Sequence, residues 1–223
     1  MTNNMKTFLP AAGTASRLSG IPKFYLPIKN DESLISYHLK NILKFENNSL
    51  EVGVSKQFYE SLVATFPEVN IKEIKSNSMV ETVYKLGLPE DKISLVVMPD
   101  TYFSDYKRID LMRQKLISNN YDIMLGLWSI RNDQKGKLGQ CSIKDDLVTN
   151  IIDKNKDCNE NFFWGLIMWN PKFNSFIRKE DSHFGESLNR AIKNNLKVGY
   201  QEFENDYFDC GTFTEYKFLI KNI

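Results

Sequence analysis

The 223-residue sequence has few of the residues that build several common kinds of site. Its two histidines, His38 and His183, are too few for a His-rich metal centre, and we expect His38 to be structural and His183 to be a surface or helix-capping residue. The three cysteines, Cys141, Cys158 and Cys210, are scattered and lack the paired spacing of a zinc site or a disulfide framework. We therefore expect reduced thiols, with Cys210 a small buried hydrophobic residue rather than a nucleophile.

Excess charge and long apolar runs are also absent. The 29 basic and 28 acidic residues leave a formal charge of +1, so a nucleic acid is not the expected partner and any anion site must be local. No apolar run approaches the roughly 18 residues of a membrane span. The first residues, MTNNMKTFL, lack the basic start and apolar core of a secretory signal. We expect a cytoplasmic protein that binds neither nucleic acid nor a membrane.

The sequence also lacks Pro/Gly-rich linkers, internal repeats and low-complexity tracts. Hydrophobic residues make up 42% of the chain, enough for one proper core. We predict a single domain over residues 1–223.

Strand-like and helix-like patterns alternate along the chain. Strands are expected at 6–9, 51–55, 69–74, 93–100, 122–130 and 197–203, and helices at 31–45 (with Asp31 as N-cap), 56–66, 79–86, 106–119, 183–195 and from about 213. The run ISLVVMPD (93–100) is the most apolar, as in a strand buried on both faces. The alternation predicts an α/β fold with a doubly wound, mostly parallel mixed sheet.

From about residue 139 the pattern changes to three short strands, QCSIK, LVTNIID and NFFWGLIMW. We interpret them as an inserted or appended β-meander, a small β-rich portion that covers a substrate.

The loop after the first strand, AAGTASRLSGIPK (11–23), has the form of a phosphate-binding turn. It lacks the G-x-G-x-x-G of dinucleotide sites and the G-x-x-x-x-G-K-[ST] of P-loops. The backbone N–H groups of Ala12 to Ala15 could form a nest for phosphate oxygens, and Arg17 and Lys23 would add positive charge. In doubly wound sheets ligands bind beyond the carboxyl ends of the strands, where this loop and Asp100 both fall.

This loop resembles that of the sugar-1-phosphate nucleotidyltransferases, the NDP-sugar pyrophosphorylase-like family, which reads approximately A-G-x-G-[ST]-R-L, then P-K and L-x-P-[IV]. The matching residues are Ala12, Gly13, Ser16, Arg17, Leu18, Pro22, Lys23, Leu26, Pro27 and Ile28. Ala15 stands where the family has its second glycine. The opening PAAG is also similar to that of the cytidylyltransferase that activates methylerythritol phosphate.

The resemblance implies the Rossmann-like nucleotide-diphospho-sugar transferase fold, with a nucleotide-binding half at about 1–130 and an acceptor-binding half at about 131–223. It implies that Arg17 and Lys23 are catalytic. The nucleotide-binding residues it implies in the loop are Ala11, Ala12, Gly13, Thr14, Ala15 and Ser16.

Two further segments resemble the metal-binding motifs of the family. VVMPDTYF maps Asp100 onto the first metal-binding aspartate, and FDCGTFTEY maps Asp209 onto the second. The resemblance implies that these carboxylates hold Mg²⁺, an ion that takes one or two carboxylates plus substrate phosphate oxygens. In the second motif Gly211 would allow a tight turn and Thr212 would cap the last helix.

The remaining matches concern the base and the acceptor. KLGQCSIKDDLVTNIIDKNKD maps Gly139 near the sugar and Lys154 onto the lysine that binds the sugar phosphate, although Asn155 replaces the family proline. FFWGLIMWNP places Gly165 where the backbone approaches the acceptor. SNSMVETVYKL stands where the family faces the base, which implicates Ser78 and Glu81.

The implied activity joins an NTP and a sugar 1-phosphate, or a similar phosphorylated metabolite, to give an NDP-sugar and pyrophosphate by Mg²⁺-dependent in-line attack at the α-phosphate. The partners are then the NTP and a small phosphorylated acceptor, with base, acceptor and oligomeric state open. One alternative is a glycosyltransferase of related fold, although Asp100-Thr101-Tyr102 lacks the second acid of a D-x-D motif. Another is a nucleotide- or sugar-phosphate-sensing module, suggested by Ala15 and Asn155 but opposed by the two aspartates with Arg17 and Lys23.

Overall fold

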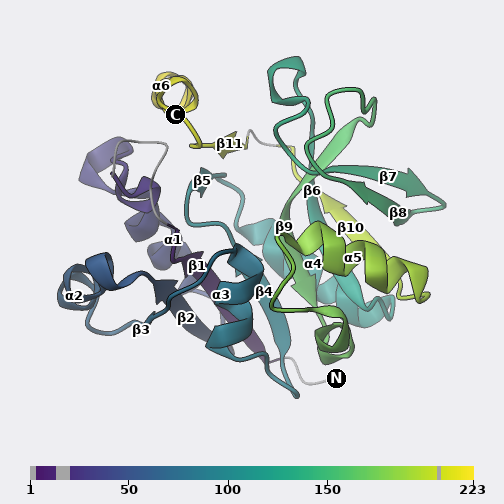
Figure 1. Cartoon of the computed structure of the whole chain (residues 1–223), viewed down its shortest axis with the longest axis horizontal. Helices are drawn as coiled ribbons and strands as arrows, with labels where there is room; N and C mark the ends of the chain where they lie inside the picture. The colour runs from purple at the N-terminus through teal and green to yellow at the C-terminus, as the bar shows by residue number, and fades with distance from the viewer. Residues whose placement is uncertain (1–3, 14–20, 205–206) are drawn as a thin grey trace.

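The computed structural model describes residues 4–13, 21–204 and 207–223, which form one twisted sheet with helices on both faces (Figure 1). The order of its seven main strands is β10-β6-β9-β4-β1-β2-β3. They are β1 (Met5–Ala11), β2 (Asn48–Val54), β3 (Asn70–Glu73), β4 (Ile93–Val97), β6 (Ile123–Ser129), β9 (Phe162–Trp169) and β10 (Val198–Glu202). All neighbours are parallel except that β9 is antiparallel to β4 and β6. The predicted doubly wound, mostly parallel α/β fold is confirmed.

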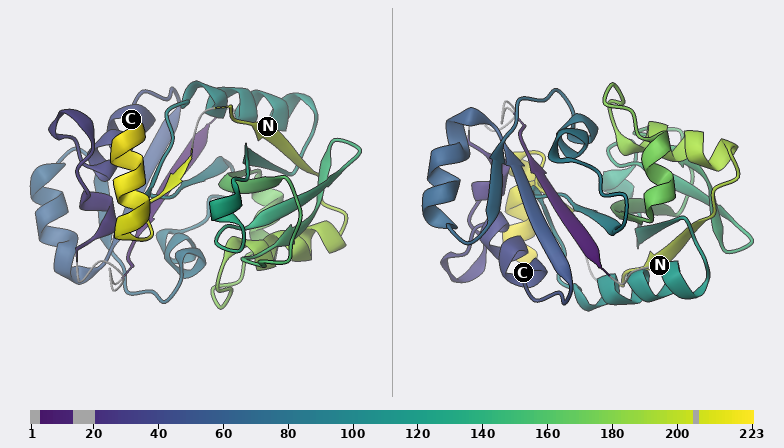
Figure 2. Two further views of the ribbon diagram at one scale, coloured as in Figure 1. Left: turned by 90° about the horizontal axis from the view of Figure 1, so that it is seen from above. Right: turned by 90° about the horizontal axis from the view of Figure 1, so that it is seen from below.

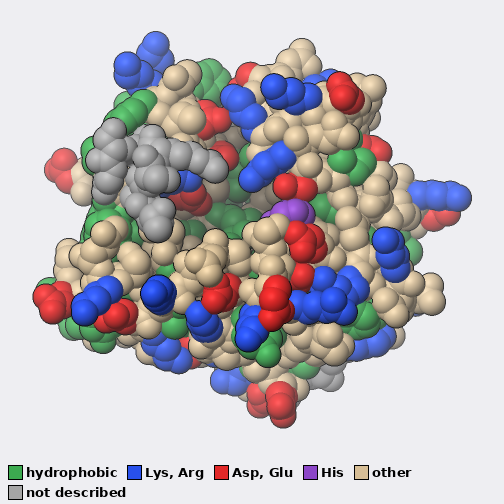
Figure 3. Space-filling view, in the orientation of Figure 1, with side chains coloured by type: hydrophobic (Ala, Val, Ile, Leu, Met, Phe, Trp, Pro, Cys, Tyr) green, Lys and Arg blue, Asp and Glu red, His purple; other side chains and the backbone are tan. Residues whose placement is uncertain are grey.

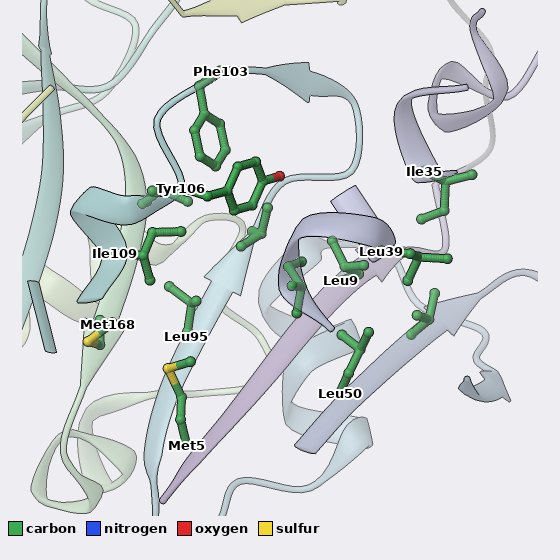
Figure 4. Close-up of a cluster of buried hydrophobic side chains, with 14 of the residues drawn as sticks. Met5, Leu9, Ile35, Leu39, Leu50, Leu95, Phe103, Tyr106, Ile109 and Met168 are labelled. Atoms are coloured by element: carbon green, nitrogen blue, oxygen red, sulfur yellow. The ribbon is translucent and has the colours of Figure 1, made fainter. Parts of the chain in front are cut away.

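The helices divide between the two faces of this sheet. Helices α1 (Leu34–Ile42), α2 (Lys56–Thr65) and α4 (Lys107–Ser118) pack on one face, and α3 (Met79–Leu86) and α5 (Phe184–Lys193) on the other. Because side chains alternate along a strand, Leu9 of β1 enters the first cluster and Phe8 the second. Figure 4 shows the first cluster, where Leu9 lies among side chains such as Ile35 and Leu39.

The prediction that the third short strand, NFFWGLIMW, belongs to a covering meander is wrong. The residues of that strand form β9, which lies between β4 and β6 in the main sheet. The physical reason is that the segment FFWGLIMW has no charged residue and is almost wholly apolar. Seven of its eight residues are buried, as in a strand covered on both faces. The two expected halves of the chain therefore contribute strands to one sheet.

What remains of the predicted meander is the hairpin of β7 (Gln140–Lys144) and β8 (Leu147–Ile152). It joins the sheet through two residues of β7, Gln140 and Cys141, which pair with β9.

The predicted N-cap of the first helix is also wrong. Asp31 ends a short 3-10 turn (Lys29–Asp31) with φ of 59°, in the left-handed region. Ser33 is the N-cap instead, because its hydroxyl accepts a hydrogen bond from the N–H of Ser36 at 3.3 Å.

A second, two-stranded sheet lies beyond the carboxyl ends of β1 and β4. It pairs β5 (Thr101–Tyr102) with β11 (Phe208–Asp209) in antiparallel register. The last helix, α6 (Phe213–Asn222), follows β11 and packs through Leu219 on Phe208 and Leu26. Seen from above, α6 and the β7–β8 hairpin lie on two sides of this end of the sheet (Figure 2). Thr212 caps α6 as predicted, accepting from the N–H of Glu215.

Short 3-10 turns complete the chain at Lys23–Tyr25, Asn132–Gln134 and Pro171–Phe176. Among the described residues, no helix has both the length and the apolar character needed to cross a bilayer.

Candidate active site

A cavity of about 590 Å³ opens at the carboxyl ends of β1 and β4. In the space-filling view a hollow is surrounded by acidic, basic and histidine side chains (Figure 3). The predicted site residues in its lining are Ala11, Ala12, Gly13, Lys23, Ser78, Asp100, Gly139, Lys154 and Asp209. The size suits a small-molecule ligand, since such sites usually measure about 300–1,000 Å³.

The β5–β11 pairing brings the two predicted metal ligands into this cavity. Asp209 lies opposite Thr101 in the ladder, and the N–H of Cys210 donates to the backbone oxygen of Asp100 at 3.0 Å. A turn after β4 directs Asp100, because the hydroxyl of Thr101 donates to the backbone oxygen of Met98 at 3.0 Å. The Cys210 side chain is fully buried, and burial raises the pKa of its thiol, as expected for a structural cysteine.

The electrostatics of the aspartate pair are unusual. Burial raises the pKa of Asp209 from 3.8 to about 7, and repulsion from the Asp100 carboxylate acts in the same direction. The Lys23 ammonium opposes this rise, and its Nζ lies 2.7 Å from Oδ2 of Asp100. A further positive charge beside Asp100 and Asp209 would reduce the repulsion between the two carboxylates.

These two carboxylates fit a Mg²⁺ site completed by substrate. The described part of the chain contains no group of three or more His, Cys, Asp or Glu side chains placed to enclose a metal. Mg²⁺ does not need such a cage, because it keeps waters and takes one or two carboxylates together with substrate phosphates. The mutual repulsion at Asp100 and Asp209 is the feature that makes the pair suited to a cation.

Lys23 is held at the cavity wall by a short turn. Pro22 precedes the 3-10 turn Lys23–Tyr25, and the next side chain, Phe24, is buried. Phe24 meets the ring of Phe58 edge-on, with ring centres 5.6 Å apart. This aromatic anchor fixes the turn and leaves the lysine facing Asp100.

On the nucleotide side, the described part of the first loop ends at Gly13. A Cβ added at Gly13 would meet no atom of the described residues within 4 Å. The predicted residues Thr14, Ala15, Ser16 and Arg17 lie outside the described residues.

Ser78 and Glu81 form the start of helix α3. The hydroxyl of Ser78 accepts from the N–H of Glu81 at 3.0 Å and donates to the backbone oxygen of Asp181 at 2.9 Å. The Glu81 carboxylate accepts from the N–H of Asn77 at 2.7 Å and pairs with Lys85 at 2.7 Å. Ser78 is thus the N-cap of α3, and it lines the cavity, whereas Glu81 does not.

The lining residues Lys137, Leu138, Gly139, Asp153, Lys154, Trp164 and His183, here called the β8 side of the cavity, lie around the β7–β8 hairpin, β9 and α5. Lys154 adopts φ of 46°, a left-handed conformation that is uncommon outside glycine and often marks a functional site. Gly139 is needed for packing, since a Cβ there would lie 2.6 Å from Nε1 of Trp164.

Gly165, in contrast, is not brought to the cavity lining. A Cβ added there would lie 2.5 Å from the ring of Tyr207 and 2.9 Å from that of Trp128. The glycine therefore makes room for an aromatic cluster within the core.

Sequence reasoning missed four residues of the β8 side, namely Lys137, Leu138, Trp164 and His183. His183 is the N-cap residue of α5, as expected, but its side chain makes no capping hydrogen bond and lines the cavity. No local pattern distinguishes such a histidine from a capping one. His38 is structural as predicted: it is fully buried, its Nε2 bonds the backbone oxygen of Thr101 at 2.8 Å, and its Nδ1 bonds the hydroxyl of Tyr106.

Comparison with known proteins gives a likeness of fold. No protein-family model matches the chain. No curated protein matches its sequence either. Among solved structures it is similar to a protein from Bacillus anthracis assigned as a glucose-1-phosphate thymidylyltransferase, with a TM-score of 0.82 and 18% identity, over 98% of this chain and 96% of that one.

Two further solved structures are similar to the chain in fold. A UDP-glucose pyrophosphorylase complexed with UDP-glucose has a TM-score of 0.75 and 15% identity, over 98% of this chain and 97% of that one. A UTP-bound UDP-glucose pyrophosphorylase from Acinetobacter baumannii has a TM-score of 0.74 and 13% identity, over 98% and 92% of the two chains. The chain thus has the Rossmann-like fold of the sugar nucleotidyltransferases along nearly its whole length.

Proposed function

We propose that this protein is a nucleotidyltransferase that joins an NTP and a sugar 1-phosphate, or a similar phosphorylated metabolite, and releases pyrophosphate. The observation that carries the proposal is the meeting of Asp100, Asp209 and Lys23 in one cavity from distant parts of the chain. The fold shared with proteins named as nucleotidyltransferases supports it.

In the proposed reaction a phosphate oxygen of the acceptor attacks the α-phosphorus of the NTP. A new oxygen–phosphorus bond forms while the bond from the α-phosphorus to the β-phosphate oxygen breaks, and pyrophosphate leaves with that electron pair. The attacking oxygen is already an anion, so no strong general base is required. The barrier lies mainly in bringing two anions together, which makes positioning and charge neutralisation the tasks of the protein.

Named residues of this chain can carry out these tasks. Lys23 neutralises charge that develops at the α-phosphate, and Arg17 is proposed to stabilise the leaving pyrophosphate. Asp100 and Asp209 would hold Mg²⁺, which would supply positive charge that offsets the charge of the substrate phosphates. Lys154 binds the phosphate of the acceptor, and Ala12 and Gly13 offer backbone to the NTP phosphates.

The test is an assay of pyrophosphate release with Mg²⁺, each NTP in turn and a panel of sugar 1-phosphates. Release that requires both substrates and disappears in Asp100→Asn supports the proposal. Asp105→Asn is the matched control, because Asp105 pairs with Arg108 outside the cavity lining.

Two outcomes would replace the proposal. Binding of an NTP without turnover on any acceptor would identify a sensor. Transfer only from a nucleoside-diphosphate sugar would identify a glycosyltransferase.

A further inference from the structure

Helix α1 contacts two segments that carry opposite charges of the candidate site. At its start, the N–H of Leu34 donates to the backbone oxygen of Leu26, which ends the turn that holds Lys23, at 3.0 Å. One turn further on, the side chains of Tyr37 and His38 reach β5 and the residue that follows it. The helix therefore links the lysine turn to the strand that comes directly after Asp100.

Both ring nitrogens of His38 are used in this contact. The side chain is fully buried, and burial lowers its pKa from 6.5 to about 4, so the ring is neutral at pH 7 and carries one N–H. The backbone oxygen of Thr101 can only accept, so Nε2 carries the proton and donates to it at 2.8 Å. Nδ1 then accepts from the hydroxyl of Tyr106. These two bonds fix the tautomer and the orientation of the ring.

Tyr37 makes a parallel contact from the preceding position of the helix. Its hydroxyl donates to the backbone oxygen of Phe103 at 3.1 Å, and its ring stacks on that of Tyr102 with ring centres 4.9 Å apart. The Phe103 side chain is buried in turn and stacks on Tyr106 (Figure 4). Tyr37 and His38, two consecutive residues of α1, thus fix the backbone oxygens on either side of Tyr102.

The strand that they hold is too short to hold itself. β5 has two residues, which pair only with the two residues of β11, and a two-stranded ladder is marginally stable at best. Asp100 directly precedes β5, and its backbone oxygen accepts from the N–H of Cys210 at 3.0 Å. The position of the Asp100 carboxylate, 2.7 Å from Nζ of Lys23, therefore depends on contacts from outside the ladder.

We propose that His38 and Tyr37 are positioning residues that hold β5, and with it the Asp100 carboxylate, where it meets Lys23 and Asp209. The inference rests on the proposed function and deepens it. The described lining of the cavity includes neither side chain, so both act through Asp100 and not on a substrate. Placement matters at this point, because a displacement of about 1 Å at a reacting group can cost roughly 100-fold in rate.

Three variants remove these contacts to different degrees. His38→Leu keeps an apolar side chain but has no donor, whereas His38→Gln keeps an amide N–H for the backbone oxygen of Thr101. Tyr37→Phe keeps the stacked ring and loses only the hydroxyl. The matched control is Leu62→Ala, because Leu62 is fully buried in the same hydrophobic cluster but belongs to α2, which packs on β3. It lowers the stability of the fold without removing a contact to β5.

The first measurement is hydrogen exchange by NMR on the protein without metal or substrate, followed at the amide of Cys210. In His38→Leu this amide should exchange roughly 10-fold faster than in the wild type, as for the loss of one buried hydrogen bond. The amides of β1, which exchange on global unfolding, should change less. Tyr37→Phe should give a smaller effect in the same direction, and His38→Gln should recover part of the protection. Leu62→Ala should instead affect the β1 amides more than Cys210.

The second measurement is pyrophosphate release at saturating substrates over a range of Mg²⁺ concentrations. His38→Leu should lower kcat roughly 10-fold or more and raise the Mg²⁺ concentration for half-maximal rate, since a displaced Asp100 is a poorer ligand. The KM for the acceptor should stay unchanged. Leu62→Ala should keep the wild-type values at a temperature where it is folded.

An unchanged exchange rate at Cys210 in His38→Leu, or a change no larger than that at the β1 amides, would show that His38 serves only the core. Faster exchange with wild-type kcat and Mg²⁺ dependence would also overturn the positioning role. If His38→Leu does not fold, Tyr37→Phe decides by the same criteria. If the wild type transfers no nucleotide, faster exchange at Cys210 still upholds the anchoring of Asp100 by α1, although nucleotidyl transfer has failed.

Discussion

Asp181 and Asp209 lie in two regions of the molecule and are held in opposite ways. Asp181 is buried before α5, and its carboxylate accepts from Ser187 at 2.5 Å, from Arg190 at 2.7 Å and from the N–H of Arg178 at 3.2 Å. Burial by itself would raise the pKa of Asp181, but these hydrogen bonds outweigh it and lower the pKa below 3.8. Asp209 faces the cavity with its pKa raised to about 7.

The comparison separates a carboxylate that stabilises the fold from one that, in our proposal, binds a cation. At Asp181 the protein supplies donors and a cation, so its ionised form is favourable. At Asp209 burial and Asp100 make the ionised form costly, and Lys23 offsets this only in part. Such strain at a cavity is typical of functional sites.

The largest expected difference is between Asp209→Asn and Asp181→Asn. Asp209→Asn should reduce pyrophosphate release by at least about 100-fold, the scale for losing one charge-stabilising group, because a neutral amide is a weak ligand for Mg²⁺. It should leave the free energy of unfolding unchanged or higher, since it removes a repulsion. Asp181→Asn should lower that free energy by about 2 kcal/mol, because charge-assisted hydrogen bonds are lost. Urea denaturation and the pyrophosphate assay measure both quantities, and a fully active Asp209→Asn would remove the basis of the comparison.

The second prediction compares two lysines, each in a short ion pair. Lys23→Met should slow turnover roughly 100-fold, because the site loses a charge that acts at the α-phosphate. Lys40 pairs with Glu32 at 2.6 Å, is largely exposed and lies outside the cavity lining. Lys40→Met should therefore change turnover less than about 2-fold and stability by less than about 1 kcal/mol. Equal kinetic effects of the two changes would show that Lys23 acts only through the fold.

The third prediction concerns metal removal. Mg²⁺ at 100 times its dissociation constant should stabilise the wild type by about 2.7 kcal/mol, and a chelator should abolish this gain. Asp209→Asn should not respond to Mg²⁺, whereas Asp181→Asn should respond like the wild type. Differential scanning fluorimetry measures the shift in Tm, and a Mg²⁺ response that survives in Asp209→Asn would locate the ion elsewhere.

The fourth prediction is a pH dependence in which His38 and Asp209 act in opposite directions. Burial lowers the pKa of His38 from 6.5 to about 4, so between these values the unfolded chain binds the proton and the folded one does not. This contribution is full above pH 6.5 and falls by about 1.4 kcal/mol per unit as pH drops toward 4. Asp209, with its raised pKa, binds a proton in the folded state first, so its contribution rises as pH falls from about 7.

The two contributions can be separated by substitution with the metal removed. In Asp209→Asn the loss of stability below pH 6.5 should be steeper than in the wild type, and in His38→Gln it should be shallower. Urea denaturation at several pH values measures the slopes, and parallel curves for all three proteins would contradict the prediction.

The smallest expected effect distinguishes Ser78 and Glu81, the two polar residues at the start of α3. Ser78→Ala should cost about 1 kcal/mol of stability, as for loss of an N-cap, and should raise the KM for the NTP because Ser78 lines the cavity. Glu81→Gln keeps an acceptor for the N–H of Asn77 and should leave that KM unchanged. A raised KM in Glu81→Gln would support the sequence-based prediction that Glu81 faces the base.

Many helices and strands could be predicted from the sequence because their ends are set by neighbouring residues in the chain. The helix at 79–86 and the strand at 140–144 have the predicted bounds, since a capping serine and turn residues mark their ends. The position of β9 was not predictable in this way. A continuous apolar run indicates burial on both faces but does not say between which strands.

The candidate site also has residues that the sequence could identify and features that only the packing decides. Asp100 and Asp209 were identified by motifs, and their meeting through β5 and β11 follows from a pairing of two residues each, too short to leave a periodic pattern. Gly165 was assigned to the acceptor, yet its space is filled by Tyr207 and Trp128. Only the packing around a glycine decides whether it admits a ligand or an aromatic ring.

The sequence by itself determined the alternation of strands and helices, and its motifs singled out Asp100, Asp209 and Lys23 as candidate site residues. These are properties of residue type and spacing along one segment. The tertiary structure alone decided that Asp209 has a raised pKa and Asp181 a lowered one, and that His183 faces the cavity. The reason is that desolvation and charge depend on neighbours distant in the chain, which only folding brings together.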